Sequence, residues 1–260
     1  MTWQFLLTIA LGFATGVISG AFGIGGATIS TPGIRVLGAT PLEGVGSTMP
    51  CILPSAITSM IRYHKAGLIR VPVVAWTASA GAVFAIGGAL LSREVPGNGH
   101  LLMIATAALL FLNACNMART PRANLAEGET TRSPKPTPAL PLLIIGVLAG
   151  TLSGILGIGG GVLMVPLFVR WIRLTVKEAV AASIACVGII AVPGIVTHQL
   201  LGNINWTYAL GLMIAIVPGA WLGASLAVRA QEQHLRIAVA GVLGLIAIGY
   251  AIGEIASWLH

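Results

Sequence analysis

The residues of this sequence best suited to bind a ligand are two glycine clusters, Gly23-Ile24-Gly25-Gly26 and Gly157-Ile158-Gly159-Gly160, each inside a strongly apolar run. Glycine lets a ligand approach the backbone closely, and unwound backbone within a membrane survives only where it is buried in protein or lines a wet cavity. A helix that restarts after such a break presents free N–H groups and a positive dipole end, which attract an anion. We therefore expect Gly25, Gly26, Gly159 and Gly160 to line an anion site.

Close helix packing is the alternative role for these glycines. Upstream of each cluster, glycines recur every four residues, a spacing that lets two membrane helices approach through their backbones. We assign these upstream glycines to packing: Gly12, Gly16, Gly20, Gly146, Gly150 and Gly154. A dinucleotide-binding loop is excluded because no βαβ pattern surrounds either cluster.

Hydroxyl side chains lie near both clusters or just inside the apolar run that follows. Thr28 directly follows the first cluster, Ser47 and Thr48 open the next run, and Ser183 occupies the equivalent place in the second half. Each hydroxyl could bond the carbonyl four residues earlier in its own helix or an anion held between the halves. Both interpretations remain open from the sequence.

His198 and Gln199 end an apolar run in which no other charge anchors the helix. An ionisable residue near membrane depth is a functional hypothesis, and histidine titrates in the physiological range. His198 is therefore a candidate substrate or proton group, with a hydrogen-bonded interfacial histidine as the alternative. Glu43 and Glu178 each complete a Thr-x-x-Glu capping box, so we interpret them as helix caps.

Composition indicates a protein that crosses the membrane several times. Of 260 residues, 56% are hydrophobic, 8% are charged and none is Asp, whereas soluble domains carry about 25% charged residues. Most of the eight apolar runs reach the ~20 residues that a bilayer requires. The net charge of +7 comes from short loops between the runs, so it indicates membrane orientation and not nucleic-acid binding. Cys51, Cys115 and Cys186 lie in apolar runs without metal-ligand spacing, and we expect no metal, disulfide or cofactor.

The chain contains one motif twice. Residues 12–32 and 146–166 are offset by 134, and 9 of their 21 positions are identical. With one residue inserted near position 39 the repeat continues, so that Thr40 matches Thr175 and Gly67 matches Gly202. The sequence therefore predicts an all-α membrane protein of two repeats, 1–117 and 140–260, each with four apolar segments. A polar, Pro-rich linker, 118–139, joins them.

Loop charges predict how these segments cross the membrane. If every segment crosses once, Lys and Arg divide 7 to 7 between the two sides, against the positive-inside rule. If the first segment of each half instead enters and returns at its glycines, 12 fall on one side and 2 on the other. The sequence therefore predicts a re-entrant first segment, inverted repeats, a cytoplasmic linker and both termini outside.

The sequence resembles the TauE/SafE family of sulfite exporters. The resemblance rests on the doubled glycine signature with its trailing Pro32 or Pro166, on the run Thr175–Ser183, and on the stretch His198–Trp206. It implies transport of sulfite, an organosulfonate or a related sulfur anion, driven by an ion gradient. In the first half Ala27 replaces the third glycine, Gly161, so equal roles for the two halves are in doubt.

These observations together predict an inner-membrane secondary transporter that exports a small sulfur oxyanion by alternating access. We expect its site where the two glycine breaks meet, and its partners to be the anion, the lipid bilayer and a candidate second copy of the chain. A passive anion channel of the same architecture is the alternative. An intramembrane enzyme is disfavoured, because no Asp is present and no convincing catalytic pair of residues is found.

Overall fold

The computed structural model describes residues 2–91, 108, 111, 112, 115, 139–157 and 159–258. Within these residues every regular element is a helix: α1 (Thr2–Phe22), α2 (Ala27–Val36), α3 (Pro41–Lys65), α4 (Val71–Leu91), α7 (Ala139–Leu156), α8 (Gly161–Trp171), α9 (Val176–Leu200), α10 (Trp206–Arg229) and α11 (Glu232–Trp258). Nearly all of the expected linker 118–139 lies outside the described residues, as does most of the apolar segment before it.

Six of these helices contain a stretch long and apolar enough to cross a bilayer: Phe5–Phe22, Leu42–Lys65, Val71–Leu91, Val176–Leu200, Trp206–Arg229 and Glu232–Gly249. Large apolar side chains such as Leu6, Val83 and Ile214 stay more than half exposed on their outer faces. Such a surface suits lipid and not water. The chain is a multi-pass membrane protein.

The expected first segment of each half consists of two helices that meet at the glycine cluster. Gly23 and Gly25 have φ of 68° and 81°, and Gly157, Gly159 and Gly160 have φ of 67°, 79° and 68°. These left-handed values stop an α-helix, and glycine adopts them without the steric cost of a Cβ.

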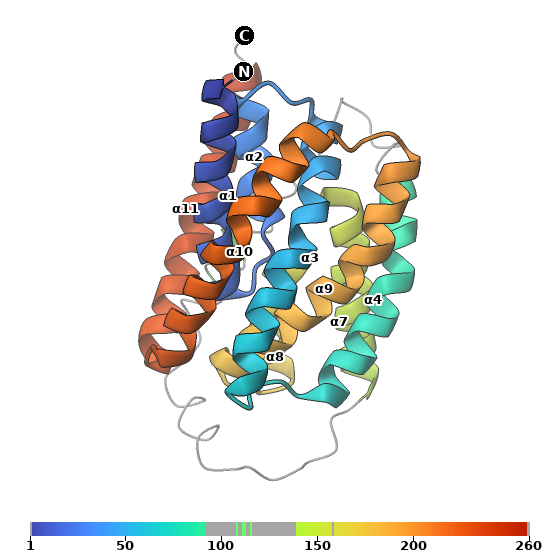
Figure 1. Cartoon of the computed structure of the whole chain (residues 1–260). Coiled ribbons are helices and arrows are strands. Elements are labelled where there is room, and N and C mark those ends of the chain that lie inside the picture. The colour runs from blue at the N-terminus through green and yellow to red at the C-terminus, as the bar shows by residue number, and fades with distance from the viewer. Residues whose placement is uncertain are drawn as a thin grey trace.

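After the first break the chain folds back on itself. Gly26 lies against Thr15, and Gly33, further along α2, lies against Leu11, which is earlier in α1. The two helices therefore run antiparallel, as the dark and lighter blue ribbons of Figure 1 show. In the second half Gly160, at the start of α8, likewise packs on Ala149 of α7.

The first helix of each half packs along a helix of the other half. A Cβ at Gly16 of α1 would overlap the carbonyl of Ile216 in α10, and a Cβ at Gly150 of α7 would overlap the carbonyl of Gly81 in α4. The packing role predicted for the upstream glycines is confirmed. In Figure 1 α1 begins and α11 ends at the same end of the molecule, with α3 and α9 crossing its centre.

Candidate functional site

The two glycine breaks touch at the centre of the molecule. A Cβ built on Gly159 would lie 3.7 Å from the Cα of Gly25. The hydroxyl of Ser183, on α9, donates a hydrogen bond of 2.8 Å to the carbonyl of Gly23. A Cβ at Gly161 would overlap that same carbonyl, which explains why glycine is found there.

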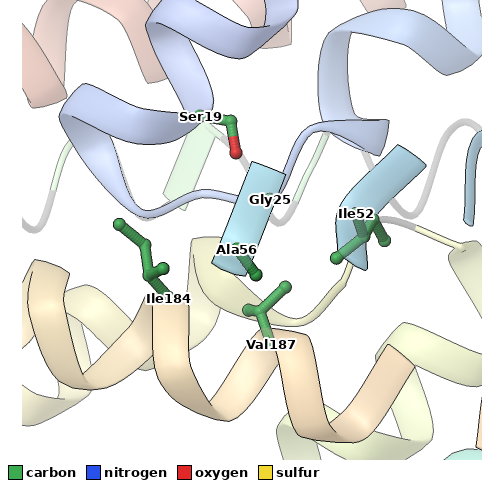
Figure 2. Close-up of a pocket in the computed structure, with 6 residues that line it drawn as sticks. All are labelled: Ser19, Gly25, Ile52, Ala56, Ile184 and Val187. Atoms are coloured by element: carbon green, nitrogen blue, oxygen red, sulfur yellow. The ribbon is translucent and has the colours of Figure 1, made fainter. Parts of the chain in front are cut away.

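A small pocket lies beside this junction, with space for about one water molecule. Its walls come from α1, the first break, α3 and α9: Ser19, Gly25, Ile52, Ala56, Ile184 and Val187. Figure 2 shows the side chains of Ile184 and Val187 rising from α9 on one side and the Ser19 hydroxyl approaching from the other. The pocket is thus apolar, with the Ser19 hydroxyl and the backbone of Gly25 as its polar groups.

The helices that start at the two breaks have no side-chain cap. The residue before α2 is Gly26 and the residue before α8 is Gly160, and a glycine has no side chain that could accept a hydrogen bond from the helix start. By contrast, α3, α9 and α10 are capped by Thr40, Thr175 and Asn205. An uncapped start leaves backbone N–H groups and partial positive charge directed into the break.

Most of the predicted hydroxyl ligands are occupied by protein groups. Thr28 donates to the carbonyl of Ile24 at 3.0 Å, and Thr48 donates to that of Gly44 at 2.9 Å. Ser47 accepts the backbone N–H of Asn205 at 2.8 Å, at the start of α10. The structure therefore places Gly25, Gly159 and Ser183 together, while Ser47 binds the residue that precedes α10. Their role toward a substrate stays a prediction.

His198 is buried and hydrogen-bonded on both ring nitrogens. Its Nε2 lies 3.3 Å from the carbonyl oxygen of Gly154, and its Nδ1 lies 3.2 Å from the side-chain nitrogen of Asn203. These contacts suit a neutral ring that donates from Nε2 and accepts at Nδ1. Gln199 is exposed, and its side-chain oxygen accepts the indole N–H of Trp206 at 3.1 Å.

Tyr63 was not predicted, although the repeat aligns it with His198 at the offset of 135 that matches Gly67 to Gly202. Its hydroxyl donates to the carbonyl of Gly20 at 2.9 Å. Gly20 and Gly154 both lie in the last turn of a broken helix, where carbonyls have no partner within the helix. Reading the repeat position by position would have found this pair, and would also have paired Ile52 with Val187 across the pocket.

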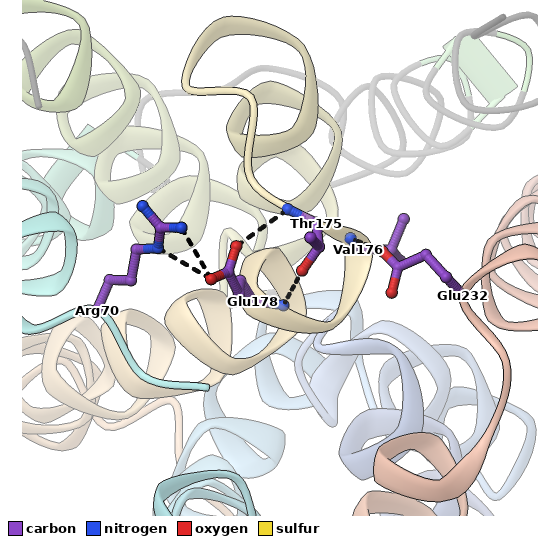
Figure 3. A network of polar contacts seen from close by, with 5 residues as sticks. All are labelled: Arg70, Thr175, Val176, Glu178 and Glu232. Atoms are coloured by element: carbon purple, nitrogen blue, oxygen red, sulfur yellow. Dashed lines mark hydrogen bonds and ion pairs between the residues drawn. The ribbon is translucent and has the colours of Figure 1, made fainter. Parts of the chain in front are cut away.

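The carboxylates Glu43 and Glu178 cap helices, as predicted: each forms a complete capping box with its threonine. Glu178 also accepts two hydrogen bonds from Arg70, at 3.0 and 2.9 Å. Glu232, at the start of α11, accepts the backbone N–H of Val176. Figure 3 shows Arg70, Glu178 and Glu232 gathered around the first turn of α9.

Comparison with known proteins agrees with this architecture. A probable membrane transporter protein of Xylella fastidiosa is 29% identical over 97% of this chain and 95% of its own length. The probable membrane transporter protein YunE of Bacillus subtilis is 27% identical over 95% of this chain and 96% of its own length. No solved structure matches the chain. The family model described as "Sulfite exporter TauE/SafE" matches residues 8–250, nearly the whole chain, and the protein therefore belongs to that family.

Proposed function

We propose that this protein is a secondary transporter that moves a small sulfur oxyanion, sulfite or an organosulfonate, by alternating access. One observation carries the proposal: the two breaks that precede the uncapped helices α2 and α8 touch at Gly25 and Gly159, and Gly25 lines a pocket in the membrane-spanning core. Both starts direct partial positive charge to the same place. Broken helices that meet between two repeats are typical of transporter substrate sites.

The two halves would lie in the inner membrane as inverted repeats, with α1–α2 and α7–α8 as re-entrant pairs. The antiparallel packing of α2 on α1 supports this arrangement. The division of Lys and Arg then places the linker in the cytoplasm and both termini outside. Gly26, Gly160, Thr28, Thr48 and Ser183 would surround the anion when the breaks separate.

An ion gradient would drive export, with His198 as a candidate proton partner. The test is counterflow of labelled sulfite into proteoliposomes that contain the purified protein. We expect saturable uptake that unlabelled sulfite inside the vesicles accelerates. Electrical conductance that does not saturate would overturn the carrier and favour a passive channel of the same architecture.

A further inference from the structure

Six hydroxyls inside the described helices are bonded within the helix that carries them. They donate to the carbonyl four residues earlier, as serine and threonine commonly do in membrane helices. This pattern holds for Thr28, Ser30, Thr48, Thr151, Thr197 and Ser225. The proton of such a hydroxyl is already donated to its own helix, so these six serve as the comparison for Ser19 and Ser55.

Ser19 and Ser55 differ from these six, because they bond each other. Ser55 of α3 donates to the hydroxyl of Ser19 of α1 at 3.2 Å. Ser55 is only 1% exposed and Ser19 only 6%. Since Ser19 accepts in this bond, its own proton is left to donate, and Ser19 lines the pocket beside Gly25. Figure 2 shows its oxygen directed toward the break.

Two further hydroxyls extend this polar line. Thr15 lies one turn before Ser19 on α1, and Ser59 lies one turn after Ser55 on α3. Both are buried, and neither hydroxyl has a hydrogen-bond partner among the described residues. Burying an unbonded hydroxyl is unfavourable, so two of them on one helix–helix face need a reason. A polar guest passing along the α1–α3 face supplies one.

All the donors at this site are neutral. Among side chains whose exposure the structure describes, no Lys, Arg, Asp or Glu is buried. No side chain offsets the charge of an anion in this core, and the cost of burying an unpaired charge rises steeply with its magnitude, so a doubly charged anion is far more unfavourable there than a singly charged one. Hydroxyl and backbone N–H donors are better matched to a singly charged oxyanion.

We infer that Ser19 is a side-chain donor to the transported anion, that Ser55 positions its hydroxyl, and that the site selects singly charged oxyanions. This inference rests on the proposed function. It assigns the side-chain recognition to the α1–α3 face of the first half, beside the uncapped start of α2.

The test is transport of three probes into proteoliposomes: hydrogensulfite, methanesulfonate as a permanent monoanion, and sulfate as a dianion. We expect Ser19→Ala to raise the KM for both monoanions about tenfold or more, the loss expected for one hydrogen bond to a charged group. Ser55→Ala should raise KM less, and Ser55→Thr, which keeps the hydroxyl, should restore it. Wild-type protein should transport sulfate poorly.

Ser30→Ala is the matched control, because Ser30 is as deeply buried but its hydroxyl is bonded at 2.9 Å to the carbonyl of Gly26. Ser19→Cys preserves the packing with a weak donor, so it reports on donation if Ser19→Ala folds poorly.

A KM for Ser19→Ala and Ser19→Cys equal to that of Ser30→Ala would overturn the assignment of Ser19 and leave the transporter proposal intact. Sulfate transported as well as methanesulfonate would overturn the charge selection. Wild-type protein that moves none of the probes would overturn the proposed function together with this site.

Discussion

In the first half of the chain Tyr63 donates to the last turn of α1, and in the second half His198 occupies the equivalent place at the last turn of α7. The backbone requirement is the same, because a carbonyl at the end of a broken helix needs a donor. The side chains differ in what else they can do: a tyrosine hydroxyl stays neutral at physiological pH, whereas an imidazole can take up a proton there.

A second difference lies on the same two helices of each half. The pair Ser19–Ser55 of the first half corresponds by the repeat to Ser153 and Ile190 in the second. Ser153 is buried, and its hydroxyl has no hydrogen-bond partner among the described residues. The first half thus carries a bonded pair of hydroxyls and a tyrosine where the second half carries a single unbonded serine and an imidazole.

The largest effect is expected from filling the junction that both halves share. Gly159→Leu would place a side chain against Val187 and Ile52 in the pocket walls, and we expect transport to be abolished. Gly202→Leu is the matched control, because Gly202 has a similar φ of 72° but opens onto free space. Sulfite flux and thermal unfolding of both variants provide the measurement. Wild-type flux in a folded Gly159→Leu protein would remove the junction from the mechanism.

The next effect separates the two uncapped helix starts. Gly26 has φ of −60°, and an added Cβ would meet only the side-chain end of Ile216 within 3.0 Å. Gly160 has φ of 68°, and its Cβ would lie 2.6 Å from the carbonyl oxygen of Ala149. Gly160→Ala should therefore lower the free energy of unfolding by at least about 1–2 kcal/mol more than Gly26→Ala. Equal unfolding temperatures in detergent would show that the second break can relax as the first does.

A smaller effect should distinguish Tyr63 from His198. Tyr63→Phe leaves the Gly20 carbonyl without its donor and should cost about 1–3 kcal/mol of stability, without changing the pH profile of transport. His198→Gln can still donate to Gly154 but cannot titrate, so we expect near-normal stability and a flattened pH profile. The measurement is counterflow of labelled sulfite by both variants across the physiological pH range. A pH profile of transport in His198→Gln that equals the wild-type profile would remove the proton role of His198.

The features that local chemistry determines could be predicted from the sequence. The two Gly-Ile-Gly-Gly clusters stop the helices that lead into them, and Thr-x-x-Glu caps the helix that follows, so the breaks and the caps at Thr40 and Thr175 could be predicted. The contact between the breaks also followed, because duplicated elements tend to meet at a shared axis.

The lining of the pocket depends on how helices from different halves cross, which no local pattern encodes. The sequence therefore does not predict the contact between Ser19 and Ser55, nor the hydrogen bond of Ser47 to Asn205 at the start of α10. The hydrogen-bond partner of the Thr28 hydroxyl could not be assigned from the sequence, because the hydroxyl could donate either to the carbonyl of Ile24, four residues earlier, or to an anion. Only the three-dimensional structure shows the 3.0 Å bond to Ile24.

The smallest expected effect compares the two capping boxes. Glu178 accepts from Arg70 as well as from its own helix start, whereas the residue equivalent to Arg70 in the second half is Asn205, which cannot pair with Glu43. Glutamine can serve in a capping box, so Glu43→Gln should leave the unfolding temperature nearly unchanged. Glu178→Gln loses the ion pair as well, but Arg70 is 42% exposed, and such pairs contribute less than about 1 kcal/mol. High salt should erase the difference between the two variants, because it screens the ion pair and not the caps. A difference that persists in high salt would mean that Glu178 holds α9 through contacts other than Arg70.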